Sequence, residues 1–351
     1  MTLLSDYDYQ LPPELIAQHP LRNRADARLM VVNRASGSIE HRHVRDLPLL
    51  LRPNDCLVLN NTKVLSARLI GRRTKTGGRW EGLFLEQDEH RLWKVMGKTR
   101  GNPQPGETID LETSDGRVGF KLEIAARTAD GCWIVKPLID KDEDSAEALE
   151  RVGWVPIPPY IRGGRMIPSD RENYQTVFAS RPGAIAAPTA GLHFTPQLLQ
   201  RFRDLGVALC PVTLHVGVGT FKPIAVEKIE EHAMHAEWAT LSETSTETIR
   251  RCKAAGGRTI AVGTTSVRVL ESAAAENGEL RPYDGMTDLF IRPPYHFRAI
   301  DALMTNFHFP KSTLLILVRL FGGDDLIRKA YEEAVREKYR FFSFGDAMLI
   351  L

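Results

Sequence analysis

Two short apolar runs near the N-terminus end in polar residues, a pattern that is typical of buried strands. They cover residues 28–33 and 55–60, and the second run continues into Asn60-Asn61-Thr62-Lys63. Polar side chains that follow a buried strand are a common place for ligand contacts in open sheets. We therefore expect two strands of one sheet here, with candidate binding groups after the second strand.

From about residue 67 the pattern changes to an alternation of apolar and polar positions. Asp115-Gly116 and Asp130-Gly131 separate such runs, and Asp-Gly between alternating segments is a strong hairpin signal. An acidic segment at 140–150, which we expect to be helical, closes the region. The strand candidates here are residues 80–86, 91–96, 108–113, 117–124 and 132–135. The pattern predicts a small antiparallel β-barrel or sandwich.

After residue 190 strand and helix patterns alternate. Thr195 before Pro196 is a helix start, Gly206 is a helix stop, and Ser242 is a candidate N-cap. Further helices are expected at 265–276, 310–321 and 324–338, and strands at 207–214, 258–262, 288–291 and 346–351. This alternation predicts an α/β domain with a largely parallel or mixed sheet.

Because the first strands precede residue 66, the β region is best interpreted as an insertion. We predict a discontinuous α/β catalytic domain, residues 1–66 and 151–351, interrupted by an antiparallel β-barrel domain at 67–150. The 351 residues, 43% of them hydrophobic, are enough to form a sizeable core. The fold class is therefore α/β with an inserted barrel.

The cysteines and the N-terminus restrict the cellular setting. Cys56, Cys132, Cys210 and Cys252 are too widely spaced for a zinc ribbon or an iron–sulfur motif, so reduced thiols are expected. The N-terminus has neither a basic region nor a long apolar run. We expect a cytoplasmic protein without a membrane partner.

Charge is even overall and uneven locally. With 46 basic and 44 acidic residues the formal net charge is +2, so a nucleic-acid partner would need a local patch. Trp80 and Trp93 lie among the basic residues of the β region, where they would either stack bases or form a core beneath a solvated face. The candidate nucleic-acid-binding residues are Arg68, Arg72, Arg73, Lys75, Arg79, Lys98 and Arg100.

Histidines concentrate in the second half of the chain, and three of them are candidate catalytic groups. His193 precedes a helix start, His215 ends an apolar strand before two glycines, and His308 follows Asn306. Histidine titrates near neutral pH and is the usual acid or base. The alternative is that each histidine only supports its own loop.

His232 and His235 also suggest a metal site, because two histidines at this spacing can share a helical face. A third ligand is not assigned and no zincin spacing is present, so we predict no metal. Residues 261–268 predict a strand–turn–helix start in which Thr264, Thr265 and Ser266 supply hydroxyls. Such a turn suits anionic or polar ligand groups, although plain N-capping explains it equally well.

These motifs together resemble one family from end to end, the S-adenosylmethionine:tRNA ribosyltransferase-isomerases (QueA) of queuosine biosynthesis. The motifs that carry the resemblance are Asp8-Tyr9-Gln10-Leu11-Pro12, residues 14–18, Asn60-Asn61-Thr62-Lys63-Val64, Pro158-Pro159-Tyr160-Ile161, Tyr174-Gln175-Thr176-Val177, residues 186–194, Thr213-Leu214-His215-Val216-Gly217, Gly219-Thr220-Phe221, His232, Met234-His235, Glu237, Val262-Gly263-Thr264-Thr265-Ser266, Thr305-Asn306-Phe307-His308 and Phe344-Gly345-Asp346-Ala347-Met348. The chain departs from the family pattern at Asn61, at Arg292-Pro293-Pro294-Tyr295 and within residues 97–106.

The resemblance implies a transferase reaction. The ribosyl group of S-adenosylmethionine moves, with isomerisation, to 7-aminomethyl-7-deazaguanine at the tRNA wobble position, giving epoxyqueuosine and releasing adenine and methionine. S-adenosylmethionine is then a substrate, no cofactor is expected, and the partners are tRNA and S-adenosylmethionine, with the protein a monomer. The implied substrate-binding residues are Asn60, Thr62, Tyr174, Gln175, Thr189, Gly217, Gly219, His232, His235, Glu237, Thr264, Thr265, Ser266, Arg268, Asp288, Asn306 and Asp346.

Two other functions fit parts of the sequence. A metal-dependent hydrolase would use His232 and His235, and would lose activity on chelation. A non-enzymatic tRNA-binding protein would bind tRNA without consuming S-adenosylmethionine.

Overall fold

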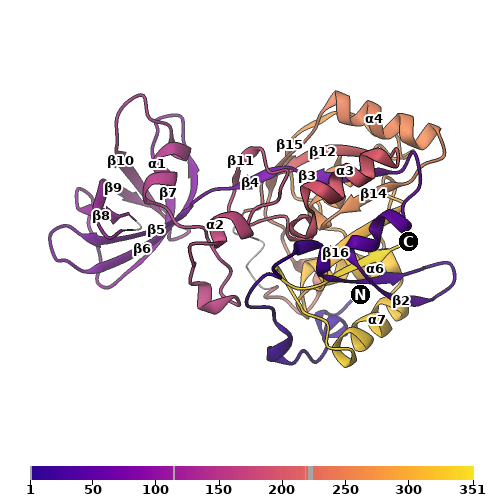
Figure 1. The fold of residues 1–351 in the computed structure, drawn as a ribbon. Coiled ribbons are helices and arrows are strands. Elements are labelled where there is room, and N and C mark those ends of the chain that lie inside the picture. The colour runs from indigo at the N-terminus through magenta and orange to yellow at the C-terminus, as the bar shows by residue number, and fades with distance from the viewer. Residues whose placement is uncertain (1, 114, 218, 220–223) are drawn as a thin grey trace.

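A large α/β unit and a closed β-barrel make up the chain in the computed structural model, which describes residues 2–113, 115–217, 219 and 224–351. The barrel lies to one side of the α/β unit (Figure 1). Two short parallel strands, β4 (Thr62–Val64) and β11 (Arg181–Ala184), lie between the two parts. The predicted fold class, an α/β protein with an inserted antiparallel barrel, is confirmed, whereas the exact domain limits stay a prediction.

A nine-stranded mixed sheet forms the centre of the α/β unit, in the order β15-β13-β12-β3-β14-β16-β17-β1-β2. The strands β12, β3, β14 and β16 run parallel, and β17 runs antiparallel to β16. The strand bounds are β1 (Arg28–Val32), β2 (Ile39–His43), β3 (Cys56–Asn60), β12 (Ala208–Leu214), β13 (Glu237–Leu241), β14 (Thr259–Val262), β15 (Tyr283–Thr287), β16 (Ala302–Asn306) and β17 (Ala347–Ile350).

Helices cover both faces of this sheet, which is why its central strands are apolar throughout. Helix α3 packs on one face with Leu57 and Ile260, and the other four helices pack on the opposite face with Val58 and Ala261. The helix bounds are α3 (Pro196–Asp204), α4 (Glu243–Ala254), α5 (Thr264–Ala273), α6 (Thr313–Gly322) and α7 (Asp324–Arg336), with a short α2 (Asp170–Asn173) outside the sheet. The predicted caps are confirmed, because Thr195 and Ser242 each accept a backbone N–H of the first turn.

The barrel closes in the order β10-β7-β6-β5-β8-β9, with antiparallel neighbours throughout. Trp80 and Trp93 are almost fully buried in its core. Helix α1 (Ser145–Val152) packs against the barrel and starts later than predicted, with Asp144 as its N-cap. The strands are β5 (Arg68–Arg73), β6 (Arg79–Gln87), β7 (Trp93–Thr99), β8 (Thr108–Glu112), β9 (Val118–Arg127) and β10 (Trp133–Leu138).

One predicted strand is displaced, and several strands have no counterpart in the prediction. The strand expected at 288–291 lies at β15, an edge strand that contains Asp284 and Gly285. Its register comes from pairing with β13, where Leu241 faces Tyr283, rather than from its own apolar pattern. The unpredicted strands are β2, β4, β5, β11, β13 and β16. No helix within the described residues is long and apolar enough to cross a bilayer.

Candidate functional site

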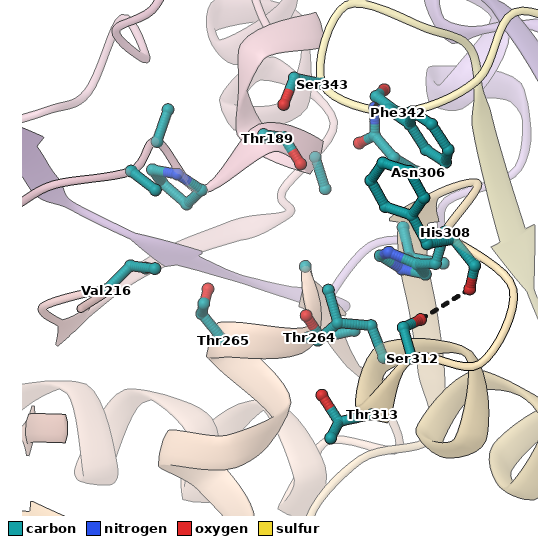
Figure 2. Close-up of a pocket in the computed structure, with 18 of the residues that line it drawn as sticks. Thr189, Val216, Thr264, Thr265, Asn306, His308, Ser312, Thr313, Phe342 and Ser343 are labelled. Atoms are coloured by element: carbon teal, nitrogen blue, oxygen red, sulfur yellow. Dashed lines mark hydrogen bonds between the residues drawn. The ribbon is translucent and has the colours of Figure 1, made fainter. Parts of the chain in front are cut away.

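A cavity of about 350 Å³ opens in the α/β unit where β14 and β16 end. The starts of α5 and α6 form one side of it, and residues 186–190 and 342–343 form the other (Figure 2). Ligands of open α/β sheets bind at the carboxyl ends of parallel strands, and β14 and β16 are parallel neighbours. The cavity is therefore the best candidate site in the described chain.

This cavity collects eight of the predicted site residues from distant parts of the sequence. One directly follows α2, and one lies in the segment after β11. The others come from β13, from α5 and from the end of β16 and the residues that follow it. The eight are Tyr174, Thr189, Glu237, Thr264, Thr265, Arg268, Asn306 and His308.

The turn from β14 into α5 presents backbone and hydroxyl groups to the cavity. Gly263 has φ 87°, a left-handed conformation that favours glycine, and no side chain of the described residues caps the helix. The first N–H groups of α5 are thus left for a ligand. The Thr265 hydroxyl is buried without a hydrogen-bond partner in the described structure. Ser266 instead turns back to Val262 O at 2.9 Å and does not line the cavity.

Glu237 and Arg268 form an ion pair in the cavity wall. The other Glu237 oxygen accepts the Gly217 N–H at 2.8 Å. Arg268 also donates to the carbonyl oxygens of Thr287, at 3.0 Å, and Leu289, at 3.3 Å. These bonds hold both side chains in place, so the wall presents them to the cavity as one fixed ion pair.

His308 is the one predicted catalytic histidine that lines the cavity among the described residues. Its Nε2 lies 2.7 Å from the Thr305 hydroxyl, and its backbone N–H donates to Tyr331 Oη at 3.0 Å. Burial lowers the pKa of His308 to about 3. The imidazole is consequently neutral near pH 7, where it can accept or donate a hydrogen bond without carrying charge.

His193 lies behind the cavity wall. It is 4% exposed and lines a small hollow with Arg24 and Ser343 rather than the main cavity. Burial lowers its pKa to about 4, the neighbouring Asn306 opposes that shift, and the cations Arg340 and Arg24 add to it. His193 therefore lies near Asn306 and outside the lining of the main cavity in the described structure.

His215 is not among the residues that line the cavity, although its sequence neighbour Val216 lines it. Its Nδ1 is 2.8 Å from the Thr62 hydroxyl, and its ring stacks on Trp238 with centroids 5.1 Å apart. A Cβ at Gly183 would come within 2.6 Å of the ring, so glycine is needed there. Burial, followed by the Arg181 charge, lowers the pKa of His215.

Several predicted residues lie outside the cavity and hold its surroundings. Asn60 bonds both backbone groups of Leu214, and Gln175 does the same for Val64. The Asp346 carboxylate accepts the backbone N–H groups of Arg28 and Arg340, and burial raises its pKa. Asp288 is exposed and also lies outside the cavity.

The motif around His232 and His235 does not form a metal centre in the described chain. His232 meets the Phe290 ring edge-on at 5.5 Å, and His235 is exposed beside Gly219. No group of three or more His, Cys, Asp or Glu side chains that could hold a metal occurs among the described residues. Thr220 and Phe221 of the neighbouring motif lie outside those residues.

The basic residues of the barrel are partly neutralised by neighbouring strands. Arg68 and Arg79 both pair with Glu81, at 3.1 and 2.8 Å. Arg72 pairs with Glu112 at 2.9 Å, and Arg73 pairs with Glu107 at 2.6 Å. The burial of Trp80 and Trp93 rules out base stacking by these two rings and confirms the alternative of core tryptophans. Among the predicted tRNA-binding residues, Lys75, Lys98 and Arg100 are exposed and have no ion pair in the described structure.

Sequence reasoning missed an aromatic wall of the cavity. Tyr160, Phe309 and Phe342 line it, and Ser343 adjoins them. Phe309 directly follows His308, so its place in the same motif was the available signal. The contact with Phe342 joins segments 33 residues apart, which no local pattern indicates.

Comparisons with known proteins agree along the whole chain. A family model described as "Queuosine biosynthesis protein" matches residues 4–350. Proteins from Symbiobacterium thermophilum and Desulfitobacterium hafniense are both named S-adenosylmethionine:tRNA ribosyltransferase-isomerase. They are 50% and 47% identical to this chain, and the alignments cover 99% of this chain and 99% of each relative. The crystal structure of an S-adenosylmethionine tRNA ribosyltransferase from Thermotoga maritima is similar, with TM-score 0.55 and 36% identity over 99% of this chain and 100% of that one.

Proposed function

The chain belongs to the family of queuosine biosynthesis proteins, and we infer that it is an S-adenosylmethionine:tRNA ribosyltransferase-isomerase. It is a transferase enzyme whose substrates are S-adenosylmethionine and tRNA. The reaction transfers and isomerises the ribosyl group of S-adenosylmethionine onto 7-aminomethyl-7-deazaguanine at the wobble position. Epoxyqueuosine-tRNA, adenine and methionine are the products.

We propose that the cavity of about 350 Å³ binds S-adenosylmethionine, and the Glu237–Arg268 pair is the observation that carries this assignment. The methionine part of the donor bears an ammonium and a carboxylate, which are the complements of these two side chains. The open start of α5, with Thr264 and Thr265, adds N–H and hydroxyl groups for an anionic or polar end.

The chemistry needs a group that removes a ribose 5′ proton and a group that assists adenine release. The sulfonium acidifies that proton, and adenine leaves more easily when it is hydrogen-bonded or protonated. We propose that His308 contacts the donor directly, since it lines the cavity as a neutral imidazole. His215, oriented by Thr62 and adjacent in sequence to the lining residue Val216, is proposed as the second acid or base, and His193 as a positioning residue near Asn306.

Three further properties are proposed from the sequence. S-adenosylmethionine is consumed as a substrate and no cofactor takes part, the protein acts as a monomer, and it works in the cytoplasm. Purified protein that loses activity on chelation would contradict the first of these, and sedimentation analysis tests the second.

Release of free adenine is the deciding measurement. Protein is incubated with S-adenosylmethionine and precursor tRNA, and adenine is quantified with tRNA omitted in a parallel reaction. We expect adenine in proportion to modified tRNA. A tRNA-binding protein without activity would bind the tRNA and leave S-adenosylmethionine intact, and a metal hydrolase would respond to a chelator.

A further inference from the structure

Three aromatic side chains form one rim of the cavity, which we call the aromatic rim: Tyr160, Phe309 and Phe342. The rings of Phe309 and Phe342 stack with centroids 3.6 Å apart and planes 24° from parallel. Tyr160 meets both rings edge-on at 5.1 Å. Phe342 lies close to Asn306 and His308 (Figure 2), and Phe309 directly follows His308 in the chain.

Exposure differs sharply within this rim. Phe342 is 4% exposed, whereas Phe309 is 40% exposed although it belongs to a segment whose Phe307 is fully buried. Leaving a large apolar ring in water forgoes the free energy gained by burying it. Phe309 therefore rests on Phe342 through its stacked face and leaves part of its surface open at the cavity mouth.

The rim is held rigidly. Tyr160 Oη and Ser343 Oγ lie 2.8 Å apart, and the Phe309 carbonyl accepts the Ser312 hydroxyl at 2.7 Å at the start of α6 (Figure 2). A ring that is already ordered loses little conformational entropy when a planar ligand stacks on it. These contacts give the open part of Phe309 the character of a preformed stacking platform.

We propose that Phe309 is the platform on which the target purine-like base of the tRNA anticodon loop stacks, a role that rests on the proposed function. Bases of single-stranded loops are unstacked and are recognised by aromatic side chains that cover one face. Stacking here holds the base beside the cavity, so that its aminomethyl group can reach the donor.

The donor also contains a purine, its adenine, which could stack on Phe309 instead of the RNA base. The position of the buried charged groups distinguishes these two possible occupants. Glu237 and Arg268, which would hold the amino-acid part of the donor, are each 7% exposed, and so lie inside the wall. Phe309 lies at the rim, where a base attached to a large RNA can arrive from solvent. The RNA base is therefore the occupant that we assign, and adenine is the competing outcome of the test.

The test uses two RNA hairpins of the anticodon arm, one with the precursor base and one abasic at that position. Phe309→Leu keeps an apolar side chain over Phe342 without an aromatic plane, Phe309→Ala removes the ring, and Phe309→Tyr restores it. We expect Phe309→Leu and Phe309→Ala to weaken binding of the base-containing hairpin about tenfold. Binding of the abasic hairpin and of S-adenosylmethionine stays unchanged, and Phe309→Tyr recovers wild-type affinity.

Two outcomes overturn the assignment: equal effects on both hairpins, or loss of S-adenosylmethionine affinity with unchanged RNA binding, which would give the platform to adenine. Thermal unfolding of each variant shows that it is folded. Wild-type protein is assayed for adenine release in parallel. Wild-type protein without adenine release contradicts the proposed function, whereas the comparison of hairpins tests the platform by itself.

Discussion

The Glu237 carboxylate and the Arg268 guanidinium form an ion pair in the cavity wall, where the two side chains keep only 7% and 8% of their exposure. A buried pair of this kind is costly to break, because the remaining partner stays charged and desolvated. Under the proposed function, the same pair both stabilises the cavity wall and contacts the amino-acid part of the donor.

Glu237→Gln keeps the side-chain shape and removes the negative charge. We expect a loss of about 3 kcal/mol in unfolding free energy, together with weaker binding of S-adenosylmethionine. Urea unfolding and calorimetric titration measure the two effects. Glu279→Gln is the matched control, since Glu279 pairs with Arg250 at half-exposed positions and should change stability by less than about 1 kcal/mol. Equal effects of the two substitutions would contradict the role of the buried pair.

Thr62→Val removes the hydroxyl that lies 2.8 Å from His215 Nδ1 while keeping the volume. Loss of this bond should cost about 1 kcal/mol of stability. If His215 acts in the reaction, its ring also loses orientation, so we expect kcat for adenine release to fall about tenfold or more with a shifted pH profile. Thr62→Ser should restore both. Lower stability with unchanged kcat and pH profile would leave His215 outside the chemistry.

Acidification should destabilise the protein through His193. Its pKa is 6.5 in an unfolded chain and about 4 in the fold, so between these values the unfolded chain binds a proton that the native state does not. Above pH 6.5 His193 is neutral in both states and does not lower the free energy of unfolding. As the pH falls towards 4, protonation of the unfolded chain lowers that free energy by about 3 kcal/mol in all. His193→Asn should flatten the pH dependence of urea unfolding between pH 7 and 4.5.

The exposed His90 provides the control for this measurement, because its side chain is 76% exposed. His90→Asn should leave the slope of unfolding free energy against pH as in the wild type. The idea fails if His193→Asn and His90→Asn give the same slope. The buried His308 lowers stability in acid in the same direction, so some dependence remains in both variants.

Local sequence signals predicted the elements that depend on local chemistry. The caps at Thr195 and Ser242 and the hairpins of the barrel are of this kind. β13 and β15 pair with each other near one edge of the sheet, so their positions and register depend on a partner distant in sequence. The same distinction applies to the candidate site. The motif around His308 predicted that this residue belongs to it, whereas the Phe309–Phe342 stack joins two loops that only the fold brings together.

The barrel's tRNA contact is predicted to depend on unpaired cations rather than on the paired arginines. Lys98 lies in β7 and Arg100 directly follows its end, and both are exposed. Arg73 is largely buried against Glu107 at 2.6 Å, so its charge is already balanced. Lys98→Ala with Arg100→Ala should weaken tRNA binding and reduce the slope of log affinity against log salt by about 1 to 2.

Arg73→Gln in a separate variant is the matched control, since it removes one positive charge from the same barrel and leaves both exposed side chains in place. Its contact with the exposed pair is to the backbone, a hydrogen bond to the Arg100 carbonyl oxygen at 3.2 Å. It should lower barrel stability more than tRNA affinity, because Glu107 is left without its partner. Filter binding across a salt series, with thermal unfolding alongside, distinguishes the two. Unchanged salt slopes in the Lys98 and Arg100 double variant would move the tRNA contact away from this side of the barrel, and a reduced slope in Arg73→Gln alone would show that ion pairing inside the barrel does not prevent phosphate binding.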